Sequence, residues 1–287
     1  MNAFNGLLTK VFNLLLVPLE LLGNEMALIL LSGIFGVLAL VVFKHISSQD
    51  GISGAKEKIK AHMIAIRLYQ DDLWVVAKSI GLVLWNNVRY VTLNFGPFIP
   101  LMPIFLVVVA QTVVRYSFEP IELVTAEEAE ALLPGQGTLL TIEFKEGQER
   151  KAGELEIIWP EGLVPQSKLV RISAEGKAWQ EFVALAPGDY EVELKVGGDT
   201  ITKTVSAGTT ELAYLQPERV SGFLDALLWP AEETIPDESP IALVKIAYPD
   251  SDLGWLPMSG VDGVLIMFVL ASIAFGLAAV KPLGVQI

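Results

Sequence analysis

The run of residues 94 to 116 constrains the fold of this chain most, because it is apolar enough to cross a bilayer and yet carries three prolines in its first third. Pro97, Pro100 and Pro103 follow one another at three-residue spacing. Each proline removes a backbone donor, so in hydrocarbon a carbonyl group needs another partner unless the proline lies in the first turns of a helix. We therefore expect a helix that starts at these prolines, near the membrane interface.

Two further runs are long and apolar enough to span a membrane. Residues 26 to 43 carry no charge and are followed by Lys44 and His45, and residues 261 to 280 are followed by Lys281. Ser32 and Gly36, four residues apart in the earlier run, would let another helix approach closely, although such pairs also occur by chance. The sequence therefore predicts three spans.

The charges divide into two segments of opposite sign. Residues 44 to 89 contain seven Lys or Arg and four acidic residues, whereas residues 117 to 260 contain ten basic and twenty-six acidic residues. The positive-inside rule places the first segment and the C-terminus in the cytoplasm, and the N-terminus and the acidic segment outside it. The acidic segment also argues against a nucleic-acid partner. We expect a multi-pass protein of the bacterial cytoplasmic (inner) membrane.

Residues 3 to 23 are apolar but are interrupted by polar residues and Pro18, which favours an amphipathic helix in the interface over a full span. A cleaved signal peptide is the alternative, although no small-x-small cleavage site precedes the next apolar run. The apolar face of the expected helix consists of Phe4, Leu7, Leu8, Val11, Leu14 and Leu15.

Residues 47 to 90 show apolar positions at three- and four-residue steps on both sides of Asp71 and Asp72, which predicts a helical hairpin. Either aspartate can cap the second arm by accepting bonds from its first amides, and we favour this structural role over a chemical one. We expect the basic residues of the first arm, Lys56, Lys58, Lys60 and Arg67, to form a solvated face near anionic lipid.

From residue 138 onward, short alternating runs are separated by Gly and Pro, which predicts a β-sandwich of about seven strands. The clearest run is residues 188 to 205, where Tyr190, Val192 and Leu194 share one face and Gly197-Gly198 supplies a hairpin turn. LAPGDY before this run is typical of a tyrosine corner in immunoglobulin-like domains. The other expected strands are residues 139–144, 155–159, 169–173, 181–185 and 212–215.

Residues 221 to 229 predict a short helix that is capped by Ser221 and stopped by Pro230. With Trp255 it would rest on the outer membrane surface. The chain offers few residues for catalysis or metal binding. It has no cysteine and only two histidines, His45 and His62, neither in a metal-ligand spacing. We expect no catalytic, cofactor-binding or metal-binding residues, and no enzyme.

The segment PFIPLMPIF, residues 97 to 105, resembles the motif that opens a core helix of the YidC/Oxa/Alb membrane-protein insertases. The basic arm KEKIKAHMIAIRLYQDD, which ends at Asp71 and Asp72, resembles the cytoplasmic arm of that family. The resemblance covers residues 5 to 116. Its motif residues are Pro97, Met102, Pro103, Ile104 and Phe105.

The resemblance implies a cofactor-free insertase that offers a polar groove to hydrophilic segments and receives clients on its hairpin. The chain departs from the bacterial pattern in two places. Bacterial members carry an arginine in the groove, and its position here would fall at Val37 or Leu38, both apolar. Bacterial members also have five core spans, whereas this chain has three, as do the archaeal members and the ER relatives. The candidate groove or substrate contacts are Ser32, Asn94, Gln111, Thr112 and Met63. Interhelical hydrogen bonding is the alternative role for the polar ones.

The expected fold is an α-helical membrane domain with an inserted extracytoplasmic immunoglobulin-like β-sandwich. Residues 1–24 form the interfacial helix, 25–116 two spans with the hairpin 47–90, 117–256 the sandwich with its connectors, and 257–287 the last span and tail. The first functional hypothesis is a membrane-protein insertase or membrane chaperone. The second is a structural subunit of a larger membrane complex. Its partners would be the lipid bilayer and either client membrane proteins or partner membrane subunits.

Overall fold

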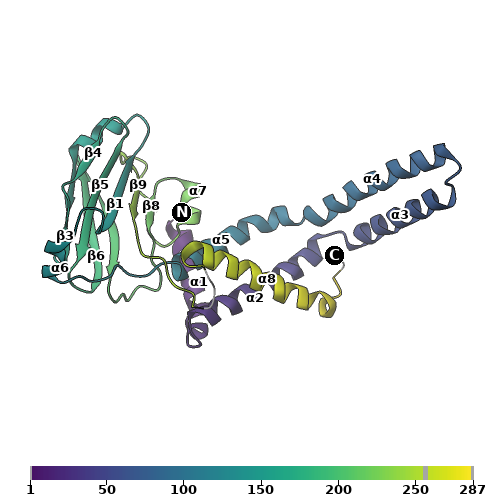
Figure 1. Ribbon diagram of the computed structural model, residues 1–287, viewed down its shortest axis with the longest axis horizontal. Coiled ribbons are helices and arrows are strands. Elements are labelled where there is room, and N and C mark those ends of the chain that lie inside the picture. The colour runs from purple at the N-terminus through teal and green to yellow at the C-terminus, as the bar shows by residue number, and fades with distance from the viewer. Residues whose placement is uncertain (1, 255–257, 286–287) are drawn as a thin grey trace. The chain divides into compact units, whose positions relative to one another are not determined.

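The computed structural model describes residues 2–254 and 258–285 and divides the chain into two compact units (Figure 1). Unit 1 comprises Met1–Leu28 and Leu106–Ile266, and unit 2 comprises Ile29–Phe105 and Met267–Ile287. Three helices contribute residues to both units: α2 (Asn24–Ile46), α5 (Phe98–Tyr116) and α8 (Gly260–Leu283).

Three segments of the described chain are helical, long and apolar enough to cross a membrane. They are α2, the nearly continuous pair α4 (Leu73–Phe95) and α5, which together run over Leu73–Tyr116, and α8. Each contains one of the three apolar runs, so the prediction of three span-length helices is confirmed.

The three prolines lie at the start of α5. Pro97 immediately precedes the helix, Pro100 lies in its first turn and Pro103 is its sixth residue. The first amides of a helix have no intrahelical partner. Prolines at the N-terminal end of α5 therefore leave few carbonyl groups without a hydrogen-bond donor. The helix begins where the prolines predicted.

The helical hairpin of unit 2 consists of α3 (Gln49–Leu68) and α4, which lie side by side in Figure 1. Asp72 caps α4, because its carboxylate accepts bonds from the amides of Trp74 and Val75 at 3.0 and 3.2 Å. The predicted cap is confirmed, and the second arm continues to Phe95, five residues beyond the expected boundary.

Helix α1 (Asn2–Glu20) belongs to unit 1, and its inward side carries polar as well as apolar residues. Asn5, Thr9, Phe12 and Leu16, at helical spacing, are buried. The outward side carries the predicted apolar residues Leu7, Val11, Leu14 and Leu15, which are 45–78% exposed. The side chain of Phe4 lies outside the described part of the structure.

The rest of unit 1 contains two antiparallel sheets, one with strand order β3-β5-β1-β9-β8 and with β4 also paired to β5, the other with order β2-β6-β7. The described residues form nine strands, compared with about seven predicted. Their bounds are β1 Thr138–Phe144, β2 Leu155–Ile158, β3 Leu163–Pro165, β4 Val170–Ile172, β5 Lys177–Ala184, β6 Gly188–Val196, β7 Asp199–Ala207, β8 Glu218–Val220 and β9 Ile241–Ile246.

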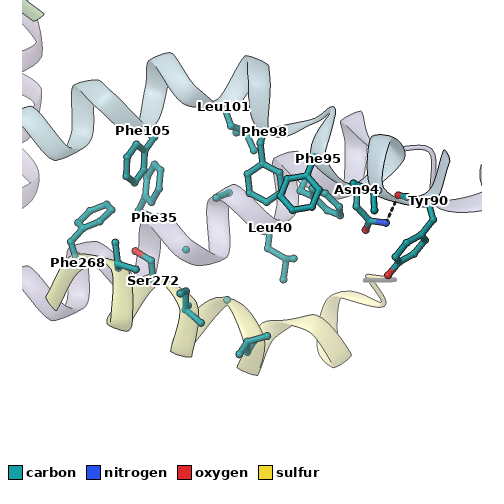
Figure 2. A pocket seen from close by; sticks show the side chains of 18 residues that line it. Phe35, Leu40, Tyr90, Asn94, Phe95, Phe98, Leu101, Phe105, Phe268 and Ser272 are labelled. Atoms are coloured by element: carbon teal, nitrogen blue, oxygen red, sulfur yellow. Dashed lines mark hydrogen bonds between the residues drawn. The ribbon is translucent and has the colours of Figure 1, made fainter. Parts of the chain in front are cut away.

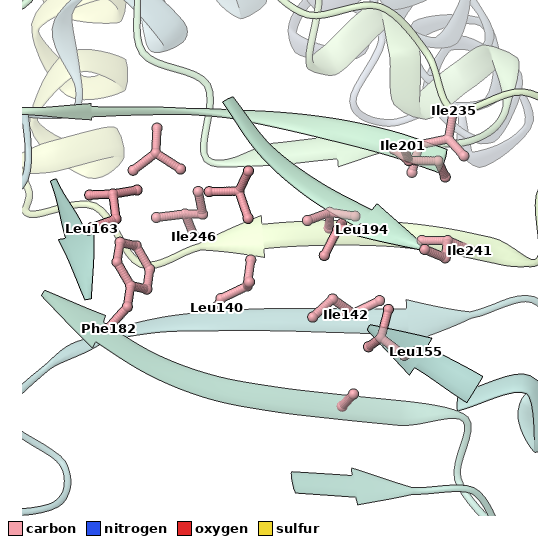
Figure 3. Close-up of a cluster of buried hydrophobic side chains, with 14 of the residues drawn as sticks. Leu140, Ile142, Leu155, Leu163, Phe182, Leu194, Ile201, Ile235, Ile241 and Ile246 are labelled. Atoms are coloured by element: carbon pink, nitrogen blue, oxygen red, sulfur yellow. The ribbon is translucent and has the colours of Figure 1, made fainter. Parts of the chain in front are cut away.

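Side chains from both sheets form one hydrophobic cluster, part of which Figure 3 shows. Ile142 and Phe182 come from the larger sheet, and Val192 and Leu194 come from the smaller one; all four are fully buried. Tyr190 packs against the same cluster, as predicted from the alternation. Its hydroxyl donates to the carbonyl oxygen of Ala186 at 2.7 Å, which confirms the expected tie of the tyrosine to the backbone.

The predicted turn between β6 and β7 is confirmed, because Val196 pairs with Asp199 across Gly197 and Gly198. Gly197 has a φ of +61°, a conformation that side chains other than glycine rarely adopt.

Several predictions in unit 1 need correction. Residues 212–215 form no strand, because the Leu215 amide donates instead to the carbonyl oxygen of Val114 in α5. The short helix α7 (Phe223–Leu228) is not capped by Ser221: its N-cap is Gly222, which offers no side chain. Residues 181–185 cover only the second half of β5. Trp255 lies outside the described residues.

Sequence reasoning missed strands β3, β8 and β9 and two short helical segments. Helix α6 (Ala126–Ala131) lies in the acidic connector and starts at a capping box, in which Thr125 and Glu128 each accept a bond from the other's backbone. A 3-10 helix, η1, covers Glu149–Glu154.

Candidate functional site

Unit 2 contains a cavity of about 580 Å³ between α2, α8 and the junction of α4 with α5 (Figure 2). The wall is dominated by apolar side chains, above all by phenyl rings. The phenylalanines that line it are Phe35, Phe43, Phe95, Phe98, Phe105 and Phe268.

Three of these rings meet at one end of the cavity. The ring centroid of Phe35 lies 6.1 Å from that of Phe105 and 5.3 Å from that of Phe268, and the last two are 5.9 Å apart. These separations fall within the range of favourable aromatic pairs. Each ring comes from a different helix, so the cluster joins α2, α5 and α8.

A second group of rings lines the part nearer the hairpin. Phe98 lies 5.9 Å from both Phe43 and Phe95, measured between ring centroids. Figure 2 shows Tyr90 and Asn94 beyond them. The Asn94 amide nitrogen donates to the carbonyl oxygen of Tyr90 at 2.8 Å, and the ammonium of Lys56 lies 5.5 Å from the centroid of the Tyr90 ring. The hairpin end of the cavity is therefore its polar end.

Small residues bring α2 and α8 together along one side of the cavity. The Ser272 hydroxyl donates to the carbonyl oxygen of Ser32 at 2.9 Å. A Cβ atom added to Gly36 would lie 2.1 Å from the carbonyl oxygen of Ser272, so only glycine allows this approach. Ser32 and Gly36 therefore face another helix, one of the two possibilities that their spacing left open.

The five candidate contact residues all lie in the described part of the chain, but only Asn94 lines the cavity. Ser32 is buried at the contact with α8. In unit 1, the Gln111 amide donates to the Thr9 hydroxyl at 3.2 Å, and the Thr112 hydroxyl donates to the carbonyl oxygen of Val109 at 2.8 Å. Met63 is 58% exposed on α3.

The residues of the proline motif divide between two sides of α5. Phe105 lines the cavity, whereas Met102, Pro103 and Ile104 are exposed away from it. Pro97 is buried just before the helix starts. Asp71 and Asp72 lie at the exposed corner of the hairpin, where Asp72 is the cap described above.

Sequence reasoning did not find the phenyl lining, although its spacing was visible. Phe98 and Phe105 are seven residues apart in α5, and Phe35 and Phe43 are eight apart in α2, separations that place each pair near one helix face. The residues around them are equally apolar, so the pattern does not distinguish a cavity from an ordinary packed interface.

The described part of the chain places no three His, Cys, Asp or Glu residues where they could hold a metal ion. The Nδ1 atom of His45 lies 2.8 Å from the carbonyl oxygen of Val41, within the same helix. The cavity lining is apolar apart from Ser272, whose hydroxyl is bonded to the Ser32 carbonyl, and the polar groups of Tyr90 and Asn94 at the hairpin end, so the cavity can hold apolar groups. No protein-family model, curated protein or solved structure matches the chain.

Proposed function

We propose that this protein is a membrane-protein insertase or membrane chaperone of the YidC/Oxa type that acts without a cofactor. The observation that carries the proposal is the phenyl-lined cavity among the three span-length helices, with Asn94 at the end where the hairpin begins. The proline motif contributes Phe98 and Phe105 to that cavity, so the resemblance and the cavity involve the same stretch of chain.

The lining indicates which kind of client the cavity suits. An apolar helix loses unfavourable contact with water when it enters an apolar cavity, whereas an unpaired polar group there costs several kcal/mol, on the order of 2 to 7. A client is therefore an apolar membrane segment held before its release into lipid, and Asn94 and Tyr90 accept its polar flank. This differs from the hydrophilic groove that the resemblance implies.

The proposal includes a topology. Helices α2, α5 and α8 span the bacterial cytoplasmic membrane, the hairpin lies in the cytoplasm, and the two sheets form an extracytoplasmic immunoglobulin-like sandwich. The charge distribution supports this orientation. The shared core and the Tyr190 bond to Ala186 support the sandwich.

A structural subunit of a larger membrane complex is the second candidate. It is favoured by Ser32 and Gln111, whose polar groups bond to other helices and so hold helices together, and by Thr112, whose hydroxyl is already bonded within its own helix. The apolar residues at the position of the groove arginine favour it as well.

Photo-crosslinking separates the two candidates. Leu277 lines the cavity and is 62% exposed, whereas Ala278 is exposed on the same helix but does not line it. A crosslinking amino acid at Leu277 should capture many different nascent membrane proteins, and one at Ala278 should capture few. Capture of one fixed stoichiometric partner at Leu277 would leave the structural subunit as the only candidate.

A further inference from the structure

Helix α4 buries polar residues on one side and exposes apolar residues on the other. The side that faces α3 buries Ser79 and Asn86, each 5% exposed. The opposite side carries a row of apolar residues that are 47–82% exposed. This row, the α4 stripe, consists of Leu73, Trp74, Ile80, Leu84, Trp85 and Val88, and it continues to Val91 and Phe95, which also line the cavity.

No charged residue of α4 lies within the α4 stripe. Helix α4 contains no acidic residue, and its two cations, Lys78 and Arg89, lie eleven residues apart and flank the stripe on one side. The outer face of α3, in contrast, exposes the charged Glu57 and Lys60 together with the apolar Ile64 and Leu68. The hairpin is therefore a two-helix layer with a mixed face on α3 and a continuous apolar face on α4, and a contiguous exposed apolar patch marks a covered surface.

The chemistry of the stripe identifies what covers it. A second copy of the chain would bring another α4, which has no acidic residue to pair with Lys78 or Arg89. Lipid phosphates supply that charge, and tryptophans such as Trp74 and Trp85 favour the boundary between headgroups and acyl chains. The stripe also continues along the exposed face of α5, a span-length helix, at Ile99.

We infer that the α4 stripe, rather than the basic face of the first arm expected from the sequence, lies on the surface of an anionic bilayer, with Lys78 and Arg89 on lipid phosphates and the outer face of α3 toward water. The hairpin is then a membrane-surface layer rather than a free arm. This inference holds for either function proposed above.

Each arm of the hairpin has a helix break at the level where the hairpin would bend onto the membrane. Ser47 and Ser48 separate α2 from α3, and Gly96 and Pro97 separate α4 from α5. The two breaks are at the same level, because a Cβ atom on Gly51 would lie 3.2 Å from the Leu93 side chain. Proline lacks the amide that would bond the carbonyl four residues earlier, which weakens the helix there. For the α4 stripe to lie on the bilayer surface, both arms of the hairpin must bend at these paired breaks.

Spin labels test the inference in the full chain, which has no cysteine of its own. Leu84→Cys and Ile80→Cys place a nitroxide on the stripe, and Glu57→Cys places the matched control on the outer face of α3. In vesicles of phosphatidylglycerol and phosphatidylcholine, the two stripe labels should collide with oxygen and be shielded from a water-soluble nickel chelate. The Glu57 label should show the reverse.

Further outcomes decide what covers the stripe. The added changes Lys78→Glu and Arg89→Glu should return the Leu84 label to the nickel accessibility of the Glu57 label. Stripe labels that are as accessible to nickel as the control would overturn the inference, as would labels shielded from both oxygen and nickel, which would indicate a second copy. Equal immersion in phosphatidylcholine alone would overturn the contact with phosphate.

Discussion

Arg115 and Glu20 form a two-pronged ion pair between α5 and α1. The guanidinium donates from Nε to one carboxylate oxygen and from Nη2 to the other, the latter at 2.7 Å. Asn13 and the Tyr116 hydroxyl complete the group. The arginine side chain is only 5% exposed, so removal of one partner would leave the other charge poorly solvated and without its counterpart.

Arg115→Gln should therefore release α1. The change leaves the Glu20 carboxylate without its cation in a site that is 23% exposed, and should cost about 2 kcal/mol. Hydrogen exchange in nanodiscs should show residues 2–20 opening roughly 30-fold more often. Lys10→Gln, at an exposed position of the same helix, is the control and should change little. Unchanged protection in Arg115→Gln would mean that apolar contacts alone hold the helix.

Gly36→Ala should destabilise the contact between α2 and α8. The new methyl group would overlap the carbonyl oxygen of Ser272, which belongs to the backbone and can move only with its helix, so we expect a cost of about 1 to 3 kcal/mol. Gly81→Ala in α4 meets nothing within 4 Å and should be neutral or stabilise the helix by about 0.5 to 1 kcal/mol. Thermal melts in bicelles compare the two, and equal effects would argue against a close helix contact at Gly36.

The two sheets should fold as an isolated domain, residues 117–254, because they share one core. Within that domain, Val192→Ala should cost about 1 to 3 kcal/mol through lost burial and a residual cavity. Glu193→Ala should cost less than about 0.5 kcal/mol, because its carboxylate makes only an exposed contact of 3.7 Å with Lys195. Urea melts measure both, and equal costs would mean that the strand faces are assigned wrongly.

The buried Lys203 should make the free energy of unfolding of the same domain increase with pH in the alkaline range. Burial lowers its pKa from the ordinary 10.5, although Glu232 opposes the shift. Between the lowered pKa and 10.5, the unfolded chain binds a proton that the folded chain does not, so the free energy of unfolding increases with pH in that window. Below the lowered pKa this contribution is lost.

Tyr248 should reverse the trend at higher pH. Burial raises its pKa above the ordinary 10.0, so the unfolded chain loses this proton first and the free energy of unfolding falls as pH rises further. Urea melts from pH 7 to 11 should show a maximum near pH 10, an order-of-magnitude estimate from the ordinary pKa values. Lys203→Met should remove the rising limb and leave the falling limb. A rise that persists in this variant would assign it to another group.

The proposed topology predicts opposite labelling at two exposed positions. A cysteine at Asp199, the exposed first residue of β7, should react with a membrane-impermeant maleimide added to intact cells. A cysteine at Lys60, on α3, should react only after the cells are opened. The reverse result would invert the orientation.

Local patterns in the sequence predicted the features that depend on nearby residues. The Asp72 cap and the turn at Gly197 each follow from residues within one turn of chain, and so does the Tyr190 bond to Ala186. Three-residue β8 is too short for a period to be visible, and β9 reads as a mostly apolar run without alternation.

The features of the candidate site that depend on distant partners could not be predicted in this way. Glu20 and Arg115 are 95 residues apart, and Ser32 and Ser272 are 240 residues apart. Nothing in the local pattern of a polar residue on an apolar helix says which helix supplies its partner. For the same reason, Gln111 was as good a groove candidate as Asn94 until their neighbours were known.

The polar residues on the inward side of α1 set an order of events during synthesis. Thr9 bonds to Gln111, which is translated 102 residues later, so the helix has no partner for this group when it leaves the ribosome. At ordinary rates of translation the interval lasts roughly 5 to 20 s. Throughout that time the leading helix can rest on lipid by its outward leucines, but its inward polar residues must stay hydrated until α5 arrives.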